Sequence, residues 1–265
     1  MDFKIIKYLI IFLLIQFNGH AIEFEGKFIQ GHFILGKTDP RAKIQIDKKS
    51  VRVSKDGFFA FGLGRDRKND VVITETFNGV KNRFVKKVLK RDYKIQRIDG
   101  LPEKKVTPPK EVYDRIRKEN NAIGEARAIN SDLQFFKEKF IMPVEGIISG
   151  VYGSQRILNG KPRWPHYGLD YAQKTGTPIK AMLSGVVTLA EDDLYYTGAT
   201  LIFDHGHGIS TLYMHMNEIF VEMGQEVKKG DVIGTVGKSG RATGPHLDVR
   251  LNWFETKLDP GSVLN

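Results

Sequence analysis

The spacing of glycine in the second half of the chain is the feature that most constrains the fold. From residue 142 to residue 265, short apolar runs alternate with glycine-containing turns, as in GIISGVYG, GTPIKAMLSGVVTLA and GQEVKKGDVIGTVG. None of these runs keeps the apolar period of about 3.6 residues that a surface helix has. Short runs at this spacing are typical of strands joined by tight turns. We therefore predict an all-β domain over residues 139–265.

Residues 22–100 also predict strands. The runs AKIQID (residues 42–47) and SVRVS (residues 50–54) alternate apolar and polar side chains. Asp56-Gly57 and Asn78-Gly79 are dipeptides that favour hairpin turns between such runs. The pattern indicates a small antiparallel β-sandwich. Because this segment holds no cluster of histidine and acidic residues, we assign it no chemistry.

Residues 101–138 form the predicted connection between the two domains. The connection opens with a proline-rich break, GLPEKKVTPPK, which is typical of a linker. An amphipathic helix is expected to begin just after Pro109, because apolar residues then recur at near-helical spacing: Val112, Ile116 and Ile123. The whole chain is thus predicted to be mostly β, with a sandwich, a linker helix and an antiparallel sheet domain.

Residues 1–21 have the three regions of a secretory signal peptide. Lys4 and Lys7 form a basic start, residues 8–17 are an apolar run, and Gly19-His20-Ala21 is a small-x-small cleavage pattern. The run is short for a membrane span, which needs about 20 residues. We expect an exported protein in the periplasm of a Gram-negative bacterium. An uncleaved signal that keeps the chain at the membrane is the alternative.

Composition limits the chemistry that an exported chain of this kind can carry. The sequence has no cysteine, so a metal ion would have to be held by histidine, aspartate or glutamate. The formal net charge is +10, which favours an anionic surface such as lipid head groups, nucleic acid or cell-wall polymer. Export argues against nucleic acid as the partner.

Two segments of the second domain each pair a histidine with an aspartate. WPHYGLD carries His166 and Asp170, and GPHLDVR carries His246 and Asp248. In a strand, residues two apart point to the same side, so His246 and Asp248 would face one cavity while Leu247 faces the core. Imidazole nitrogen and carboxylate oxygen are both zinc ligands. The residues alone leave two interpretations open: one metal site assembled from both segments, or two polar loops.

The second domain resembles the lysostaphin/LytM family of zinc endopeptidases that cut peptidoglycan. The similarity covers roughly residues 140–260, and its motifs occur in the family's order: HYGLD, DHGHGISTLYMH, and GQEVKKGDVIGTVGKSGRATGPHL. The resemblance implies a metalloendopeptidase that uses one Zn²⁺ to hydrolyse peptide cross-links in cell-wall remodelling. Its partners would be peptidoglycan and other cell-wall enzymes.

The resemblance also assigns roles to residues. It makes His166 and Asp170 metal ligands, and His215 and His246 the catalytic histidines. The family's last motif is usually H-x-H, whose second histidine is the third ligand, but this chain has Asp248 there. We expect Asp248 to take that place. Zn²⁺ with two carboxylates sums to zero charge, so this centre should polarise water less and work at higher pH.

Some alternatives remain at this stage. Some relatives lack ligands and activate wall amidases without catalysis; a chain that keeps four of the five motif residues favours the enzyme. His205 and His207 are expected to be structural, with His207 as the substitute if Asp248 binds no metal. Arg156 in GSQR could hold a substrate carboxylate through paired hydrogen bonds, or form a structural ion pair.

Overall fold

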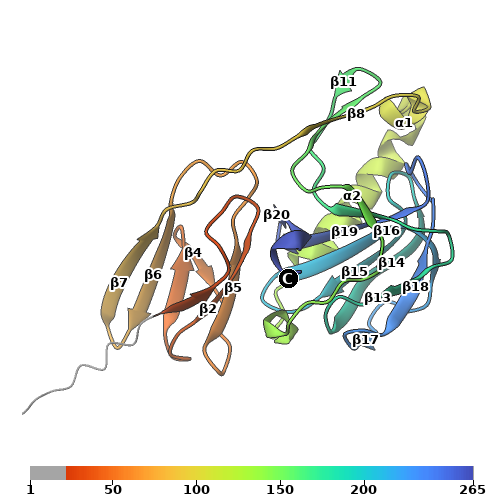
Figure 1. The fold of residues 1–265 in the computed structure, drawn as a ribbon. Helices are drawn as coiled ribbons and strands as arrows, with labels where there is room; N and C mark the ends of the chain where they lie inside the picture. The colour runs from red at the N-terminus through yellow and green to blue at the C-terminus, as the bar shows by residue number, and fades with distance from the viewer. Residues whose placement is uncertain (1–21, 265) are drawn as a thin grey trace, which may run out of the picture.

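A computed structural model describes residues 22–264 of the chain as two β domains joined by a segment that contains the main helix (Figure 1). The predicted signal peptide, residues 1–21, lies outside the described residues. Within residues 22–264, no helix has the length and apolar character needed to cross a membrane. The fold class is the mostly β class that the sequence predicts.

The N-terminal domain is the predicted sandwich of two antiparallel sheets. One sheet has the order β1 (Glu23–Glu25), β2 (Phe33–Lys37), β5 (Phe58–Gly62). The other has the order β4 (Lys49–Val51), β3 (Lys43–Ile46), β6 (Val71–Phe77), β7 (Val80–Lys86). Asn78 and Gly79 join β6 to β7 with φ values of 48° and 78°, so the hairpin turn has the two left-handed residues that Asn-Gly favours.

The sandwich ends earlier than the sequence pattern suggests. Strand β8 (Ile95–Ile98) lies inside the range assigned to the first domain, yet it pairs in parallel with β10 (Gln155–Leu158) of the second. Strand β11 (Lys161–Pro162) pairs with β10 on its other side. Alternating residues predict a strand without naming its partner, and this partner lies far along the chain. The linker is therefore bound to the second domain from residue 95 onward.

The linker helix α2 (Tyr113–Ala128) follows a short helix α1 (Glu103–Val106) and a 3₁₀ turn (Lys110–Val112), and so begins after Pro109 as expected. It lies against strands β14 and β15 of the second domain. Ala126 is its buried residue, and it packs with a small apolar group on the sheet: Leu189, Leu194, Ile202 and Leu212. The helix thus covers part of one sheet face. A second 3₁₀ turn (Phe135–Lys137) leads into the C-terminal domain.

The C-terminal domain is built on a ten-stranded antiparallel sheet. Its main path runs β17 (Glu226–Val227), β14 (Gly185–Leu194), β15 (Gly198–Asp204), β16 (Ile209–Ile219), β19 (His246–Trp253), β12 (Leu169–Ala172), β9 (Ile147–Gly150). The remaining strands are β13 (Pro178–Lys180), β18 (Val232–Val236) and β20 (Thr256–Leu258), followed by a 3₁₀ turn (Pro260–Ser262). Strands β12 and β19, near one end of this path, carry most of the candidate metal residues.

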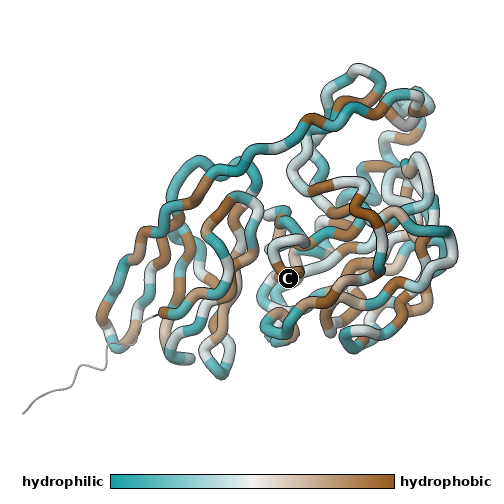
Figure 2. The backbone as a smooth tube through the Cα atoms, viewed as in Figure 1, coloured by the Kyte–Doolittle hydropathy of each residue, from teal (hydrophilic) through white to brown (hydrophobic). Residues whose placement is uncertain are grey.

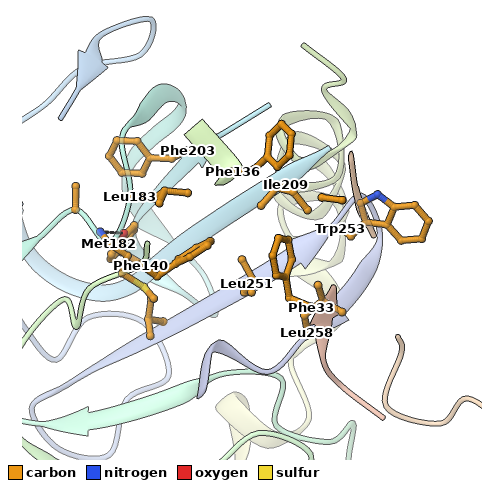
Figure 3. Close-up of a cluster of buried hydrophobic side chains, with 14 of the residues drawn as sticks. Phe33, Phe136, Phe140, Met182, Leu183, Phe203, Ile209, Leu251, Trp253 and Leu258 are labelled. Carbon is orange, nitrogen blue, oxygen red and sulfur yellow. Dashed lines mark hydrogen bonds between the residues drawn. The ribbon is translucent and has the colours of Figure 1, made fainter. Parts of the chain in front are cut away.

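One hydrophobic core runs through both domains (Figure 3). The rings of Phe33 and Phe140 lie 6.1 Å apart, so the sandwich touches the segment that enters the second domain. Leu258 packs directly onto Gly62, where an added Cβ would lie 2.4 Å from the leucine Cδ2 atom. The hydropathy view agrees, with hydrophobic stretches along strands of both domains (Figure 2). The two domains are therefore packed against each other and share buried side chains.

Candidate metal centre

Strands β12 and β19 place two carboxylates side by side. They are neighbours in the antiparallel sheet, and Asp170 stands directly opposite Asp248. Both side chains are buried. Like charges directly across two strands destabilise a sheet, and buried charges require a partner. This arrangement therefore calls for positive charge between or beside the two aspartates.

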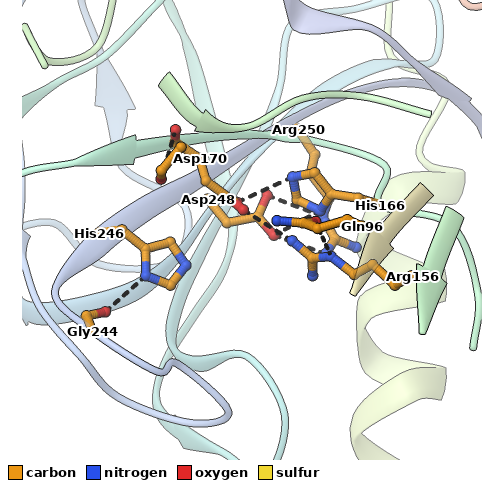
Figure 4. A network of polar contacts seen from close by, with 9 residues as sticks. Gln96, Arg156, His166, Asp170, Gly244, His246, Asp248 and Arg250 are labelled. Atoms are coloured by element: carbon orange, nitrogen blue, oxygen red, sulfur yellow. Dashed lines mark hydrogen bonds and ion pairs between the residues drawn. The ribbon is translucent and has the colours of Figure 1, made fainter. Parts of the chain in front are cut away.

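His166 completes a group of three. Its side chain is buried, with the Nε2 atom 3.1 Å from Asp170 Oδ1 and the Nδ1 atom 4.0 Å from Asp248 Oδ2. Each of the three residues offers one ligand atom, and these atoms all lie within 4.8 Å of one another. Figure 4 shows the two aspartates and the histidine converging on one point. The structure thus brings together the three residues that the sequence proposes as ligands.

The donor atoms fit a zinc ion. Both ring nitrogens of His166 and the Oδ1 atom of Asp170 are buried and have no hydrogen-bond partner among the described residues. Buried polar atoms are normally hydrogen-bonded, so orphaned atoms of this kind need another partner. Two ligand atoms on a tetrahedral zinc ion lie roughly 3.3 Å apart, close to the spacing between His166 and Asp170. One imidazole and two carboxylates are a donor set that zinc accepts.

Two glycines make room for the carboxylates. An added Cβ on Gly150, in strand β9, would lie 2.0 Å from Asp170 Oδ2. An added Cβ on Gly168 would lie 2.1 Å from Asp248 Oδ1. Sequence reasoning missed both positions. Glycine in or beside a strand often marks a close approach of other atoms, and this was the sequence signal available at both positions.

Each carboxylate is also bound by an arginine. The Nη2 atom of Arg156 donates to Asp170 Oδ2 at 2.9 Å, so Arg156 forms the structural ion pair that was one of its two predicted roles. Arg250 donates to both oxygens of Asp248, at 2.9 Å from Nη2 and 3.3 Å from Nε. Sequence reasoning missed Arg250. It lies two residues after Asp248, on the same side of an extended strand.

These arginines change the charge balance of the site. Burial alone would raise the pKa of the Asp248 carboxyl, but the charges of Arg250 and His166 outweigh it and hold that pKa well below its usual range. Asp248 is therefore ionised at neutral pH. The zero net charge predicted for Zn²⁺ and two carboxylates is a sum that leaves out two guanidinium groups. With Arg156 and Arg250 counted, the surroundings are two charges more positive than that sum.

The two expected catalytic histidines lie together beside this group. The rings of His215 and His246 have centroids 4.8 Å apart. Their Nδ1 atoms contact backbone carbonyls, Ser239 O at 3.0 Å and Gly244 O at 2.8 Å. A carbonyl only accepts, so each Nδ1 carries a proton and donates it, which in a neutral ring leaves the lone pair on Nε2. Burial lowers the pKa of His215 to about 4, which keeps it neutral at neutral pH.

An irregularity of the backbone sets the direction of the His215 side chain. Its φ is 62°, in the left-handed region that is uncommon for residues other than glycine. The pairing of β15 with β16 shifts register beside it, and His215 N donates to Thr197 O at 2.8 Å. Bulges of this kind redirect a side chain away from the strand's alternation. Because residue type does not reveal a bulge, the sequence could not predict this local geometry.

The remaining histidines of the domain have structural roles. His205 uses both ring nitrogens, with Nδ1 2.7 Å from Ser184 O and Nε2 2.8 Å from Thr211 Oγ1. His207 packs on Phe136, with ring centroids 4.3 Å apart. Neither residue belongs to the three-residue group. His207 therefore does not stand in for Asp248.

A cavity of about 330 Å³ opens onto the site. Residues of both groups line it: Asp170, Asp248, His215 and His246. Gln96 and Ile98 of β8 and Leu101 of the linker line the same cavity, so β8 and the segment after it form one wall. Gln96 Oε1 accepts a hydrogen bond from Arg156 Nε at 3.3 Å. The site can thus hold a metal ion and a small polar group next to the imidazoles of His215 and His246.

Comparisons with known proteins show what the segment that carries this centre is similar to. Residues 164–260 match Peptidase family M23. A segment of 87 residues is 40% identical to peptidoglycan DD-endopeptidase ShyA of Vibrio cholerae, covering 33% of this chain and 20% of that protein. A segment of 98 residues is 43% identical to DD-carboxypeptidase/endopeptidase Mpg of Neisseria meningitidis, covering 37% of this chain and 22% of that protein. The chain thus matches about a fifth of the length of these relatives.

A solved structure extends the similarity to both domains. A putative peptidase M23 from Pseudomonas aeruginosa superposes with a TM-score of 0.71 at 26% identity, covering 90% of this chain and 95% of that one. The match includes the sandwich and the linker as well as the sheet that carries the metal centre. Together with the match over residues 164–260, this similarity shows that the C-terminal domain of the chain resembles members of peptidase family M23 in sequence and in fold.

Proposed function

We propose that this protein is a zinc-dependent endopeptidase that hydrolyses peptide cross-links of peptidoglycan. One observation carries the proposal: three buried ligand residues converge beside two histidines whose Nδ1 atoms are held by backbone carbonyls. The relatives named as peptidoglycan DD-endopeptidases support the substrate class. The net charge of +10 suits an anionic wall polymer. Export through residues 1–21 would bring the protein to the periplasm, where other wall enzymes act.

Each residue has a separate task in this proposal. His166, Asp170 and Asp248 would hold one zinc ion, which when bound activates water and polarises a carbonyl. His215 and His246 handle protons: an Nε2 lone pair accepts a proton from water, and the imidazolium returns it to the leaving amine. Arg156 and Arg250 orient the two carboxylates through the ion pairs described above.

The test is direct. The purified protein is incubated with cross-linked muropeptides, with and without a chelator, and the products are identified by mass. We expect cleavage that the chelator stops and that added zinc restores. Unchanged muropeptides at several pH values with zinc would contradict the proposal. Stimulation of a separate amidase in the same assay would instead support the alternative, a wall-binding factor without catalysis.

Site variants separate metal binding from proton transfer. We expect His166→Ala, Asp170→Ala and Asp248→Ala to lose the metal, typically by 10-fold or more in affinity, because they remove ligands. His215→Ala and His246→Ala should keep the metal and lose most turnover, by roughly 100-fold or more. Metal analysis beside kinetics distinguishes the two groups, with His32→Gln in the sandwich as the control. Full metal occupancy in His166→Ala would overturn the ligand assignment.

A further inference from the structure

A second cavity lies next to the metal centre, between helix α2 and the sheet. Its volume is about 810 Å³. His166 lines it, and several residues that line the smaller cavity line this one too, among them Arg156, Met214, Arg241 and Arg250. The second cavity is therefore continuous in its lining with the metal centre, through His166 and these shared residues.

The charge of this second cavity is one-sided. Six of its lining residues are basic and none is acidic; the basic ones are Arg127, Arg156, Arg163, Arg241, Arg250 and Lys257. Concave sites lined by one sign of charge concentrate ligands of the opposite sign. The cavity is therefore electrostatically suited to an anion.

Most of the six have partners elsewhere. Arg156 and Arg250 pair with the metal-site aspartates. Arg163 donates to Val106 O at 3.0 Å, and Arg241 stacks over the Tyr196 ring at 4.6 Å. The two basic residues that remain are Arg127 and Lys257.

Arg127 and Lys257 have no carboxylate partner among residues 22–264. Both side chains are half-buried, and neither forms a salt bridge there. The Nε atom of Arg127 is buried with no hydrogen-bond acceptor. Lys257 lies over the Tyr167 ring, with Nζ 5.0 Å from its centroid. Glu255, the acidic residue that acts on both, is exposed and does not line the cavity.

Burial and the positive charge of Arg250 act against the charged forms of both Arg127 and Lys257. Burial lowers the pKa of Arg127, and the charge of Arg250 lowers it further. Burial likewise lowers the pKa of Lys257, followed by the charges of Arg127 and Arg250. Holding buried like charges together costs stability unless an anion compensates. The cluster thus resembles a binding site more than a structural network.

We propose that this second cavity is a subsite for a free carboxylate of the peptide substrate, bound by Arg127 and Lys257. The inference rests on the proposed peptidase function, because the anion of a peptide close to its scissile bond is a carboxylate. The planar guanidinium of Arg127 can donate two parallel hydrogen bonds to it. The preferred cross-link then carries a carboxylate on the carbon that bears the released amine.

The experiment uses two synthetic cross-linked peptides that differ at one group. One has a free carboxylate on the residue whose amine is released, and the other has a carboxamide there. We expect the parent protein to cleave the carboxylate form with a kcat/KM about 10-fold higher, in line with a charge-assisted hydrogen bond. Arg127→Gln should bring the two rates within about twofold, chiefly by slowing the carboxylate form, and Lys257→Gln should act in the same direction.

Lys118→Gln is the matched control. It removes one positive charge from the exposed side of the same helix, at a residue that does not line the cavity, and should keep the full preference. A parent that cleaves both peptides equally, or an Arg127→Gln variant that folds normally and keeps the preference, would overturn the subsite. If the zinc-loaded parent cleaves neither peptide, the proposed function fails, and calorimetric binding of the same two peptides then decides the subsite separately.

Discussion

At the scale of single residues, Asp248 and Arg250 must be understood together. Arg250 donates two hydrogen bonds to Asp248, and both side chains are largely buried. Removing one partner of a buried pair leaves the other as an uncompensated charge. The carboxylate at residue 248 is therefore tied to its own arginine as well as to the proposed metal ion.

This pairing makes a prediction about placing histidine, the ligand that the family resemblance implies, at residue 248. Asp248→His alone should lower the free energy of unfolding by about 3–5 kcal/mol, because Arg250 loses its carboxylate. Asp248→His combined with Arg250→Met should recover most of that loss and bind zinc. Urea unfolding and metal titration of both variants provide the measurement, with Arg250→Met alone completing the cycle. A stable Asp248→His single variant would show that the pair is dispensable.

The buried histidines away from the site predict a pH dependence of stability. Burial lowers the pKa of His205 and of His207 to about 4 each. The unfolded chain, with a histidine pKa near 6.5, takes up these protons first as the pH falls. Stability should therefore be full above about pH 6.5 and decline toward pH 4, by up to about 3 kcal/mol for each histidine. Urea unfolding at pH 7.5, 6 and 5 measures the slope.

His207→Asn provides the control for that slope. Asparagine does not titrate in this range and tolerates the left-handed backbone at residue 207, where φ is 55°. The variant's stability should vary less with pH than the parent's, whatever its absolute stability at pH 7.5. An unchanged slope would mean that His207 is not protonated on unfolding.

At the scale of elements, the two-residue period of strands accounts for much of what the sequence could predict. It correctly put His246 and Asp248 on one side of β19 and Leu247 in the core, where Leu247 is fully buried. It did not reveal the bulge that turns His215 toward the site, because a bulge breaks that period. Nor could it pair β8 with β10, since strand partners depend on the tertiary fold.

The glycines beside the carboxylates test how tightly the strands fix the metal ligands. Gly150→Ala should displace Asp170 and weaken metal affinity by about 10–100-fold, as expected when the support of a ligand is disturbed. Gly124→Ala is the control, because an added methyl group on α2 meets nothing within 4 Å. It should leave metal binding unchanged and raise stability by about 0.5–1 kcal/mol. Normal metal affinity in Gly150→Ala would mean that Asp170 can move freely.

At the scale of the whole molecule, the sequence predicted two domains but not their union. Each predicted β domain is present, yet Leu258 fills the space above Gly62, and the rings of Phe61 and Trp253 lie 6.4 Å apart. Nothing in the pattern of either segment shows that an apolar side chain faces the other domain. The same limit hid the basic cavity, whose charges come from α2, β10, β19, β20 and two loops.

A shared core predicts cooperative unfolding. Leu258→Ala should destabilise the protein by about 2–5 kcal/mol and lower the unfolding midpoint of both domains together. Thermal unfolding monitored by hydrogen exchange in the sandwich and in the sheet domain measures this. Phe220→Ala, at an exposed residue of the same domain, is the control. Loss of protection in the sheet domain alone would mean that the domains unfold independently.

The Asp248–Arg250 pair also bears on how such a site changes over evolution. A lineage that replaces histidine by aspartate at residue 248 gains a buried anion, and an arginine arriving first at residue 250 is a buried cation. Each single step is unfavourable, so the two substitutions should be inherited as a unit. Related sequences should then fall into two groups, histidine with a neutral neighbour two residues on, or aspartate with arginine, with few mixtures.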